Sequence, residues 1–226
     1  MNYLNGLSLC FDLDGTIIDT APDLIRVLNR VIEEEGLGAT DYKLARREVG
    51  YGARVLIEQA CERAAHDIAP DRLDDLLQLF LELYADDIAQ KSHAFAGVCD
   101  TLAFLKASGA ELSVCTNKPG YLARPLLEAL DMTGYFVRTI GSDDVPRKKP
   151  HQSHIFAAAG HKSRKKIVMI GDSLPDILAA KNAKVPSIAV TYGYSAIPVH
   201  KLGANGVIRR FRDLPLALKK VLDAWP

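Results

Sequence analysis

The sequence has no excess of charge of either sign and no long apolar run. Its 28 Lys and Arg residues are balanced by 28 Asp and Glu residues, so the formal net charge is zero, whereas nucleic-acid-binding domains usually carry a basic excess. No apolar segment reaches the ~18 residues that a membrane-spanning helix needs. The first ten residues contain no basic stretch of the kind that opens a secretory signal peptide. We therefore expect neither nucleic acid nor a membrane as a partner.

Cysteine is scarce. The four cysteines, Cys10, Cys61, Cys99 and Cys115, are widely separated, and none forms a Cys-x-x-Cys pair. The spacing therefore indicates neither a zinc site nor a redox-active pair. Free thiols are typical of reducing compartments, so we expect a cytoplasmic protein.

What the sequence does have is the composition of an ordinary globular protein, with 48% hydrophobic and 25% charged residues over a length of 226. The apolar run at 7–11 predicts a short buried strand, and residues 20–90 are helical in pattern, with no convincing strand. After residue 97, strands and helices alternate. Strands are predicted at 112–116, 137–140, 167–170, 187–190 and 206–208, and helices at 98–106, 120–130, 152–159, 173–184 and 213–224.

This order of elements predicts an α/β fold. Alternating strands and helices form a parallel sheet with helices on both faces, and the first strand belongs with the later ones. We expect a Rossmann-like core made of residues 1–17 and 91–226, interrupted by an α-helical cap domain at 18–90.

Polar side chains cluster after several of the predicted strands or in adjacent loops, where ligands gather in open α/β sheets. An Asp-x-Asp pair alone is weak evidence, since acidic pairs are common on protein surfaces. Several clusters of compatible chemistry in matching positions are much stronger evidence. They comprise four carboxylates, a hydroxyl, an amide and two lysines: Asp12, Asp14, Thr116, Asn117, Lys118, Lys149, Asp172 and Asp176.

The chemistry of these groups indicates a phosphate and magnesium site. Asp12 and Asp172 offer the hard oxygen ligands that Mg²⁺ prefers, and Thr116 and Lys149 can hold phosphoryl oxygens. Gly15 allows the backbone amides of its turn to approach a phosphate closely. A carboxylate can attack phosphorus as a nucleophile, and a second one two residues later can act as general acid and base.

The motifs resemble those of the haloacid dehalogenase-like (HAD) superfamily. The first motif of that superfamily is similar to Phe11–Thr16, the second to Thr116–Lys118, the third to Lys149–Pro150 and the fourth to Gly171–Asp176. The resemblance spans residues 7–194, which is nearly the whole chain.

The resemblance also implies a role for each matching residue. Asp12 would be the nucleophile and Asp14 the general acid and base, which favours phosphoryl transfer over dehalogenation. Both would bind Mg²⁺, Asp14 through its backbone carbonyl, and Asp172 would be a further ligand. The phosphoryl group would be bound by Thr116, Asn117, Lys149 and Gly15, while Asp176 and Ser173 would support these groups.

Further segments resemble bacterial phosphoglycolate phosphatases, among them 19–24, 50–56, 143–146 and 190–194. In that family a helical cap follows the first motif. The resemblance implies a Mg²⁺-dependent phosphatase with 2-phosphoglycolate as substrate and an aspartyl phosphate as intermediate. The alternatives are a phosphomutase of the same superfamily, a phosphatase for another small phosphate ester or pyrophosphate, and a non-catalytic interaction protein on this fold.

Two cap residues are candidates for substrate binding. Arg54 suits bidentate recognition of a carboxylate and Gly52 lies near it, although a helix-surface arginine and a turn glycine would explain the same residues.

In the basic run at 147–149, the Pro150 that follows identifies Lys149 as the cation that faces the site, and a solvated basic loop is the alternative. A monomer and a homodimer are both compatible with the sequence.

Overall fold

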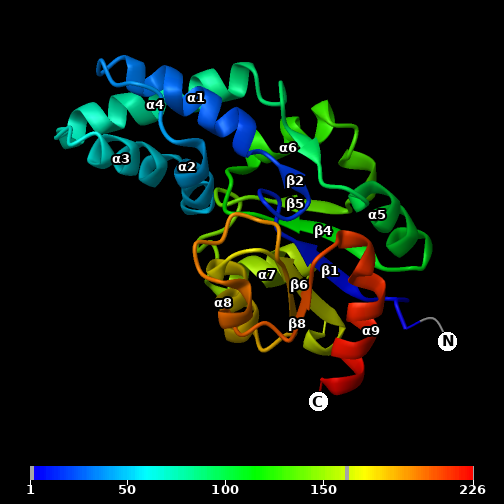
Figure 1. Cartoon of the computed structure of the whole chain (residues 1–226). Coiled ribbons are helices and arrows are strands. Elements are labelled where there is room, and N and C mark those ends of the chain that lie inside the picture. The colour runs from blue at the N-terminus through cyan, green and yellow to red at the C-terminus, as the bar shows by residue number, and fades with distance from the viewer. Residues whose placement is uncertain (1–2, 161–162, 226) are drawn as a thin grey trace.

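The computed structural model describes residues 3–160 and 163–225 and has two lobes (Figure 1). One lobe is a parallel sheet with helices on both faces, and the other is a group of helices inserted after the first strand. This arrangement confirms the α/β fold with a helical cap that the sequence predicts.

The core is built on one sheet. Within the described residues it has six strands in the order β5-β4-β1-β6-β7-β8, and all neighbouring strands are parallel. The central strand is β1, in which Cys10 is paired with Ser113 of β4 and with Met169 of β6. Every predicted strand forms, with ends that differ by no more than one residue. The strands are β1 (Ser8–Phe11), β4 (Glu111–Cys115), β5 (Arg138–Ile140), β6 (Ile167–Gly171), β7 (Ser187–Val190) and β8 (Gly206–Ile208).

Helices cover both faces of the sheet because successive side chains of a strand point to opposite faces. Leu9 and Phe11 of β1 are buried in the core cluster on one face, whereas Cys10 packs with Ile155 and Met169 on the other. The helices on the first face are α5 (Val98–Ala107), α6 (Gly120–Ala129) and α9 (Leu214–Ala224), and those on the second are α7 (Gln152–Ala159) and α8 (Leu174–Ala183).

The cap is a helical layer in which α1 packs against α3 and α4. The apolar residues of α1 recur every three to four positions, so they form one buried stripe along the helix. That stripe consists of Leu24, Val27, Leu28 and Val31. The cap elements are α1 (Ala21–Glu33), α2 (Tyr42–Glu48), a 3₁₀ turn (Val49–Tyr51), α3 (Ala53–Arg63) and α4 (Pro70–Asp86).

The two chain segments that join the lobes pair with each other. β2 (Ile18–Asp19) and β3 (His93–Ala94) form a short antiparallel ladder in which Ile18 lies opposite Ala94. The sequence does not predict these strands, because two residues are too few to show an alternating pattern. The predicted domain boundaries, at 17–18 and 90–91, lie next to this ladder, and the division of the chain there stays a prediction.

No helix in the two described ranges is long and apolar enough to cross a membrane. The four cysteines are free, and Cys10, Cys61 and Cys115 are buried.

Candidate active site

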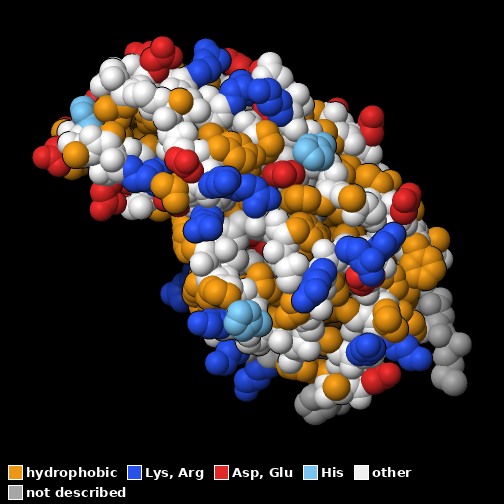
Figure 2. Space-filling view, in the orientation of Figure 1, with side chains coloured by type: hydrophobic (Ala, Val, Ile, Leu, Met, Phe, Trp, Pro, Cys, Tyr) orange, Lys and Arg blue, Asp and Glu red, His pale blue; other side chains and the backbone are white. Residues whose placement is uncertain are grey.

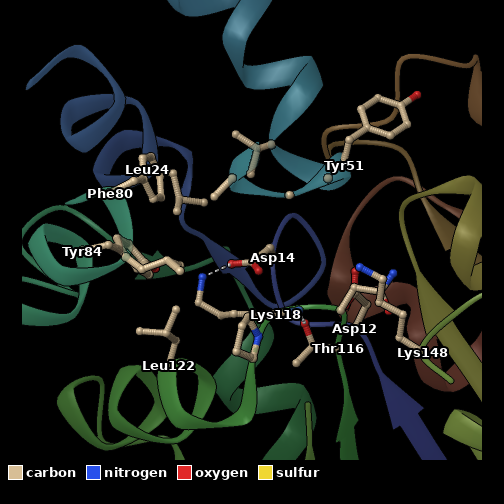
Figure 3. Close-up of a pocket in the computed structure, with 17 residues that line it drawn as sticks. Asp12, Asp14, Leu24, Tyr51, Phe80, Tyr84, Thr116, Lys118, Leu122 and Lys148 are labelled. Atoms are coloured by element: carbon tan, nitrogen blue, oxygen red, sulfur yellow. Dashed lines mark hydrogen bonds and ion pairs between the residues drawn. The ribbon is translucent and has the colours of Figure 1, made fainter. Parts of the chain in front are cut away.

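The loop after β1 carries two carboxylates that face in different directions. The ladder continues to Asp12, whose N–H donates to the carbonyl of Ile170 (2.9 Å). The chain then turns at Gly15, which has a φ of +81°. A Cβ at this position would lie 2.7 Å from Oδ2 of Asp172, so the turn needs glycine both for its conformation and for the close approach. The turn leaves Asp14 on the side that faces the cap (Figure 3).

Asp12 meets two further carboxylates at the ends of neighbouring elements. Oxygen atoms of Asp12, Asp172 and Asp176 lie within 4.8 Å of one another, and all three residues are buried. Lys149 offsets part of this charge, because its Nζ lies 2.8 Å from Asp12 and 2.6 Å from Asp176. Burial and the nearby carboxylate of Asp176 raise the pKa of Asp12 and of Asp172, against the opposing effect of Lys149. The cluster therefore holds three carboxylates against one buried lysine.

The start of α8 fixes one of these carboxylates. Oδ2 of Asp176 accepts hydrogen bonds from the N–H (3.0 Å) and the hydroxyl (2.7 Å) of Ser173, as in a helix capping box. The other oxygen, Oδ1, accepts from Lys149. Ser173 therefore orients Asp176, and Asp176 fixes the position of the Lys149 ammonium group.

Lys149 is also fixed through its backbone. Its N–H donates to Nδ1 of His154 (3.2 Å), and Nε2 of His154 lies 3.1 Å from the carbonyl of Ile140. These partners suit a neutral ring with its proton on Nε2. Burial, followed by the charge of Lys149, lowers the pKa of His154 to about 4. The neighbouring Arg147 and Lys148 are exposed, so Lys149 is the buried cation of this basic run.

The end of β4 adds a hydroxyl and an amide to the site. Thr116 is buried, and its Oγ1 accepts a hydrogen bond from the N–H of Lys118 (3.1 Å). Asn117 donates from Nδ2 to the carbonyl of Lys149 (3.0 Å). Its Oδ1 is buried and has no hydrogen-bond partner within the described chain. The second predicted motif therefore lies against the third.

A cavity of about 110 Å³ lies between the core loops and the cap (Figure 3). Pockets for drug-sized ligands have volumes of about 300–1,000 Å³, so this one suits a much smaller molecule. Its polar lining comes from the core: Asp12, Asp14, Thr116, Asn117, Lys118 and Lys148. Its cap lining comes from apolar side chains and from the turn before α3: Leu24, Val49, Gly50, Tyr51, Gly52, Ala53, Phe80, Leu81 and Tyr84.

The surface around the junction of the two lobes is rich in basic side chains. Figure 2 shows Lys and Arg side chains gathered there, around a hollow in which acidic atoms are visible. A basic rim of this kind raises the local concentration of small anions. The charges of this region therefore suit a phosphorylated ligand.

The three buried carboxylates fit a divalent cation. They supply hard oxygen donors, and their mutual repulsion would be relieved by a positive charge between them. The side chain of Asp14 is turned away from this cluster: its Oδ1 accepts from the hydroxyl of Thr20 (2.6 Å) and lies 3.3 Å from Nζ of Lys118. The side chain of Asp14 is therefore not part of this cluster.

The site and its fold have known counterparts. The sequence matches the haloacid dehalogenase-like hydrolases over residues 9–190. It is 42% identical to a phosphoglycolate phosphatase of Caulobacter vibrioides, with 100% of this chain and 96% of that protein covered. The chain belongs to the haloacid dehalogenase-like hydrolase family. A phosphoglycolate phosphatase of Agrobacterium fabrum is 41% identical, with 92% of this chain and 90% of that protein covered.

A solved structure agrees with this assignment. The crystal structure described as that of "a predicted phosphoglycolate phosphatase" from Haemophilus somnus has a TM-score of 0.87 and 30% identity, over 94% of this chain and 97% of that one. This hydrolase is therefore an enzyme of the phosphoric monoester hydrolase class.

This hydrolase brings the predicted core residues together but only one of the two cap candidates. Gly52 lines the cavity, whereas Arg54 does not. The guanidinium of Arg54 pairs with Asp74 of α4, and both side chains are exposed. The first turn of α3 directs Arg54 away from the site, which the type of residue alone does not reveal.

The loop after β7 also contributes to the hydrolase's site. The sequence singles out residues 190–194 by resemblance but gives them no role. The N–H of Tyr194 donates to Oδ2 of Asp172, and its hydroxyl donates to Asp19 (2.6 Å). Arg46 of α2 donates to the carbonyls of Gly193 (3.1 Å) and Tyr192 (3.2 Å). The signal for this loop is the one that reveals Asp12, a polar segment directly after a predicted strand.

Proposed function

We propose that this hydrolase removes the phosphoryl group of a small phosphate ester, with 2-phosphoglycolate as its preferred substrate, in a Mg²⁺-dependent reaction through an aspartyl phosphate. The observation that carries the proposal is the position of Asp12. Its carboxylate follows the central strand, lies 2.8 Å from Nζ of Lys149 and lines a cavity that Asp14 also lines. The names of the Caulobacter and Agrobacterium relatives support the choice of substrate.

The two carboxylates of the β1 loop divide the chemistry between them. In the first step an oxygen of Asp12 bonds to phosphorus, the ester P–O bond breaks, and the leaving oxygen takes a proton from Asp14. In the second step Asp14 takes a proton from a water molecule that attacks phosphorus. The bond from phosphorus to Asp12 breaks, which releases inorganic phosphate and restores both carboxyl groups.

The remaining polar groups bind and orient the phosphoryl group. Thr116 and Lys149 would contact its oxygens, with Asn117 beside them. The N–H of Gly15 donates to the carbonyl of Ile18 (3.0 Å), so Gly15 would contribute through the close approach that its turn allows and not as a donor. Because Asp176 and Ser173 hold the ammonium group of Lys149, they act as positioning residues.

The metal site would be formed by Asp12, Asp172 and the backbone carbonyl of Asp14. Bound there, Mg²⁺ would offset the negative charge of the phosphoryl group beside the nucleophile. Asp176 contributes to the same buried cluster, but its pairing with Lys149 makes it a supporting group in this proposal.

The cap has a separate task. Its apolar side chains, among them Leu24 and Phe80, cover the cavity and would exclude bulk water from the reacting groups. We propose residues 18–90 as this cap domain, with 1–17 and 91–226 as the catalytic core. The free cysteines suit an enzyme of the cytoplasm, working as a monomer or a homodimer.

Phosphate release from a panel of small phosphate esters tests the proposal, with and without Mg²⁺. The wild type should act best on 2-phosphoglycolate and only with the metal. Asp12→Asn should lower kcat by at least about 1,000-fold, since it removes the nucleophile. Asp75→Asn makes the same change on the exposed side of the cap and serves as the control. Full activity of Asp12→Asn would rule out the assigned nucleophile, and a folded wild type without activity on any ester would rule out the proposed function.

A further inference from the structure

A buried lysine lies in the cavity but outside the phosphate and metal cluster. The side chain of Lys118 is 5% exposed, and its Nζ lies 3.3 Å from Oδ1 of Asp14. The same Nζ lies 4.4 Å from the centre of the Tyr84 ring, which belongs to α4 of the cap. Of the cations that line the cavity in the described chain, Lys148 is exposed, whereas Lys118 is buried.

Lys118 lies where the rest of a bound substrate would extend. In Figure 3, Asp12 and Thr116 lie on one side of the cavity and Lys118 and Tyr84 on the other, with Asp14 between them. A phosphoryl group next to Asp12 would direct the remainder of a small molecule toward Lys118. The cavity volume of about 110 Å³ leaves room for only a few more atoms there.

The surroundings of Lys118 suit an anionic group. An ammonium group has three N–H donors, and Asp14 is the one carboxylate that the structure pairs with it among the described residues. Tyr84 adds a second donor, because its hydroxyl is buried and donates to no group in the described chain. The neighbouring walls are apolar, with Leu24, Phe80 and Leu122, and they strengthen a charge-assisted hydrogen bond.

We propose that Lys118, together with the hydroxyl of Tyr84, binds a carboxylate of the substrate and so selects small phosphorylated carboxylic acids. The inference rests on the proposed function for the position of the phosphoryl group. It adds a specificity-determining pair, formed by one residue from the core and one from the cap. The pair can form only when the cap lies over the core, so the carboxylate would also favour the closed arrangement.

A simpler role for Lys118 would be to hold Asp14 in place. The two roles differ in their dependence on the substrate. If the lysine acts only through Asp14, its removal should change the binding of every phosphate ester by the same factor. If it binds a carboxylate, its removal should weaken the binding only of esters that carry one.

Binding measured without turnover separates these roles. In an Asp12→Asn background, with MgCl₂ present, calorimetry compares 2-phosphoglycolate with 2-hydroxyethyl phosphate, which lacks the carboxylate. We expect the protein with Lys118 to prefer 2-phosphoglycolate by about 10- to 100-fold, as for a charge-assisted hydrogen bond. Lys118→Met should reduce this preference to about 3-fold or less, and Tyr84→Phe should reduce it by about 3- to 10-fold.

Two controls make the test specific. Lys148→Met removes an exposed positive charge from the lining of the same cavity. It should weaken the binding of both esters by a similar factor and leave the preference for 2-phosphoglycolate unchanged. If Lys118→Met does not fold, as judged by circular dichroism, Tyr84→Phe carries the test because it keeps the aromatic ring. Retention of the full preference in either folded variant, or no preference in the parent, would overturn the inference. If the wild type hydrolyses neither ester while the binding preference is present, the proposed function fails and the carboxylate site stands.

Discussion

The N–H of Tyr194 donates a 2.6 Å hydrogen bond to Oδ2 of Asp172. The adjacent Gly193 offers its carbonyl to Arg46 of the cap, so one short loop contacts both the buried carboxylate and the inserted domain. The guanidinium of Arg46 also lies 4.7 Å from the centre of the Tyr194 ring. The orientation of Asp172 and the position of the cap are therefore linked through residues 192–194.

Removal of the Arg46 side-chain charge should loosen this link. Arg46→Met loses two charge-assisted hydrogen bonds to backbone carbonyls at a partly exposed position, so we expect the free energy of unfolding to fall by about 1–2 kcal/mol. The value of kcat/KM should fall by roughly 10-fold, because the cap would close less often over the site. Chemical unfolding and steady-state kinetics measure the two effects. Arg47→Met, at an exposed neighbour on α2, is the control; equal behaviour of the two variants would contradict the link.

Gly15 should be far less tolerant of a side chain than Gly36, although both have positive φ. Alanine costs about 1–2 kcal/mol at either position through backbone strain. At Gly36 nothing lies within 4 Å of the added Cβ, whereas at Gly15 the Cβ would meet Asp172. We therefore expect Gly15→Ala to lower kcat by about 100-fold or more and Gly36→Ala to leave it nearly unchanged. Similar kcat values for the two variants would show that the contact with Asp172 is unimportant.

Added Mg²⁺ should stabilise the folded protein through the buried carboxylates. A ligand that binds only the folded state adds about 2.7 kcal/mol at a concentration of 100 Kd. Thermal unfolding of the wild type should therefore shift to higher temperature as MgCl₂ is titrated in, and EDTA should reverse the shift. Asp172→Asn should show little or no shift, while Asp75→Asn should behave as the wild type does. A full shift in Asp172→Asn would place the cation elsewhere.

His154 should make the fold sensitive to acid. Its pKa is lowered to about 4 in the folded state, mainly by burial, against about 6.5 in an unfolded chain. The unfolded state therefore binds the proton first, and stability is lost as the pH falls from about 6.5 to 4, by up to about 3 kcal/mol from this group. Urea unfolding at several pH values in this window measures the effect.

A variant isolates the contribution of His154 from that of other titrating groups. His154→Gln should be less stable than the wild type at pH 7, because it disturbs the contact with the N–H of Lys149, but its stability should decline less steeply toward pH 4. An unchanged slope in His154→Gln would contradict the assignment.

The sequence is sufficient to predict that the carboxylates of the site meet, but not which side chains line the cavity beside them. Asp12 and Asp172 follow apolar runs that form parallel strands, and parallel strands bring their carboxyl ends to one edge, so their meeting is predictable. The contact of Lys118 with Tyr84 joins a core loop to a cap helix, and its prediction needs the placement of one lobe on the other. Arg54 is the opposite case, a residue that the sequence offers as a substrate ligand and the structure places elsewhere. Its residue type suits a carboxylate, but its position on α3 pairs it with Asp74.

The pairing of β2 with β3 has a consequence for how such enzymes diversify. Paired strands bring backbones within about 5 Å, so the main chain leaves the core and re-enters it at nearly the same point. A loop of a few residues would close that gap, and the remaining chain would still supply β1, β4, β6 and every carboxylate of the buried cluster. An insertion of different shape at this single junction would change which molecules reach Asp12 without altering a strand beneath it. The buried carboxylates and the cap's share of the cavity lining are thus encoded in separate stretches of the chain.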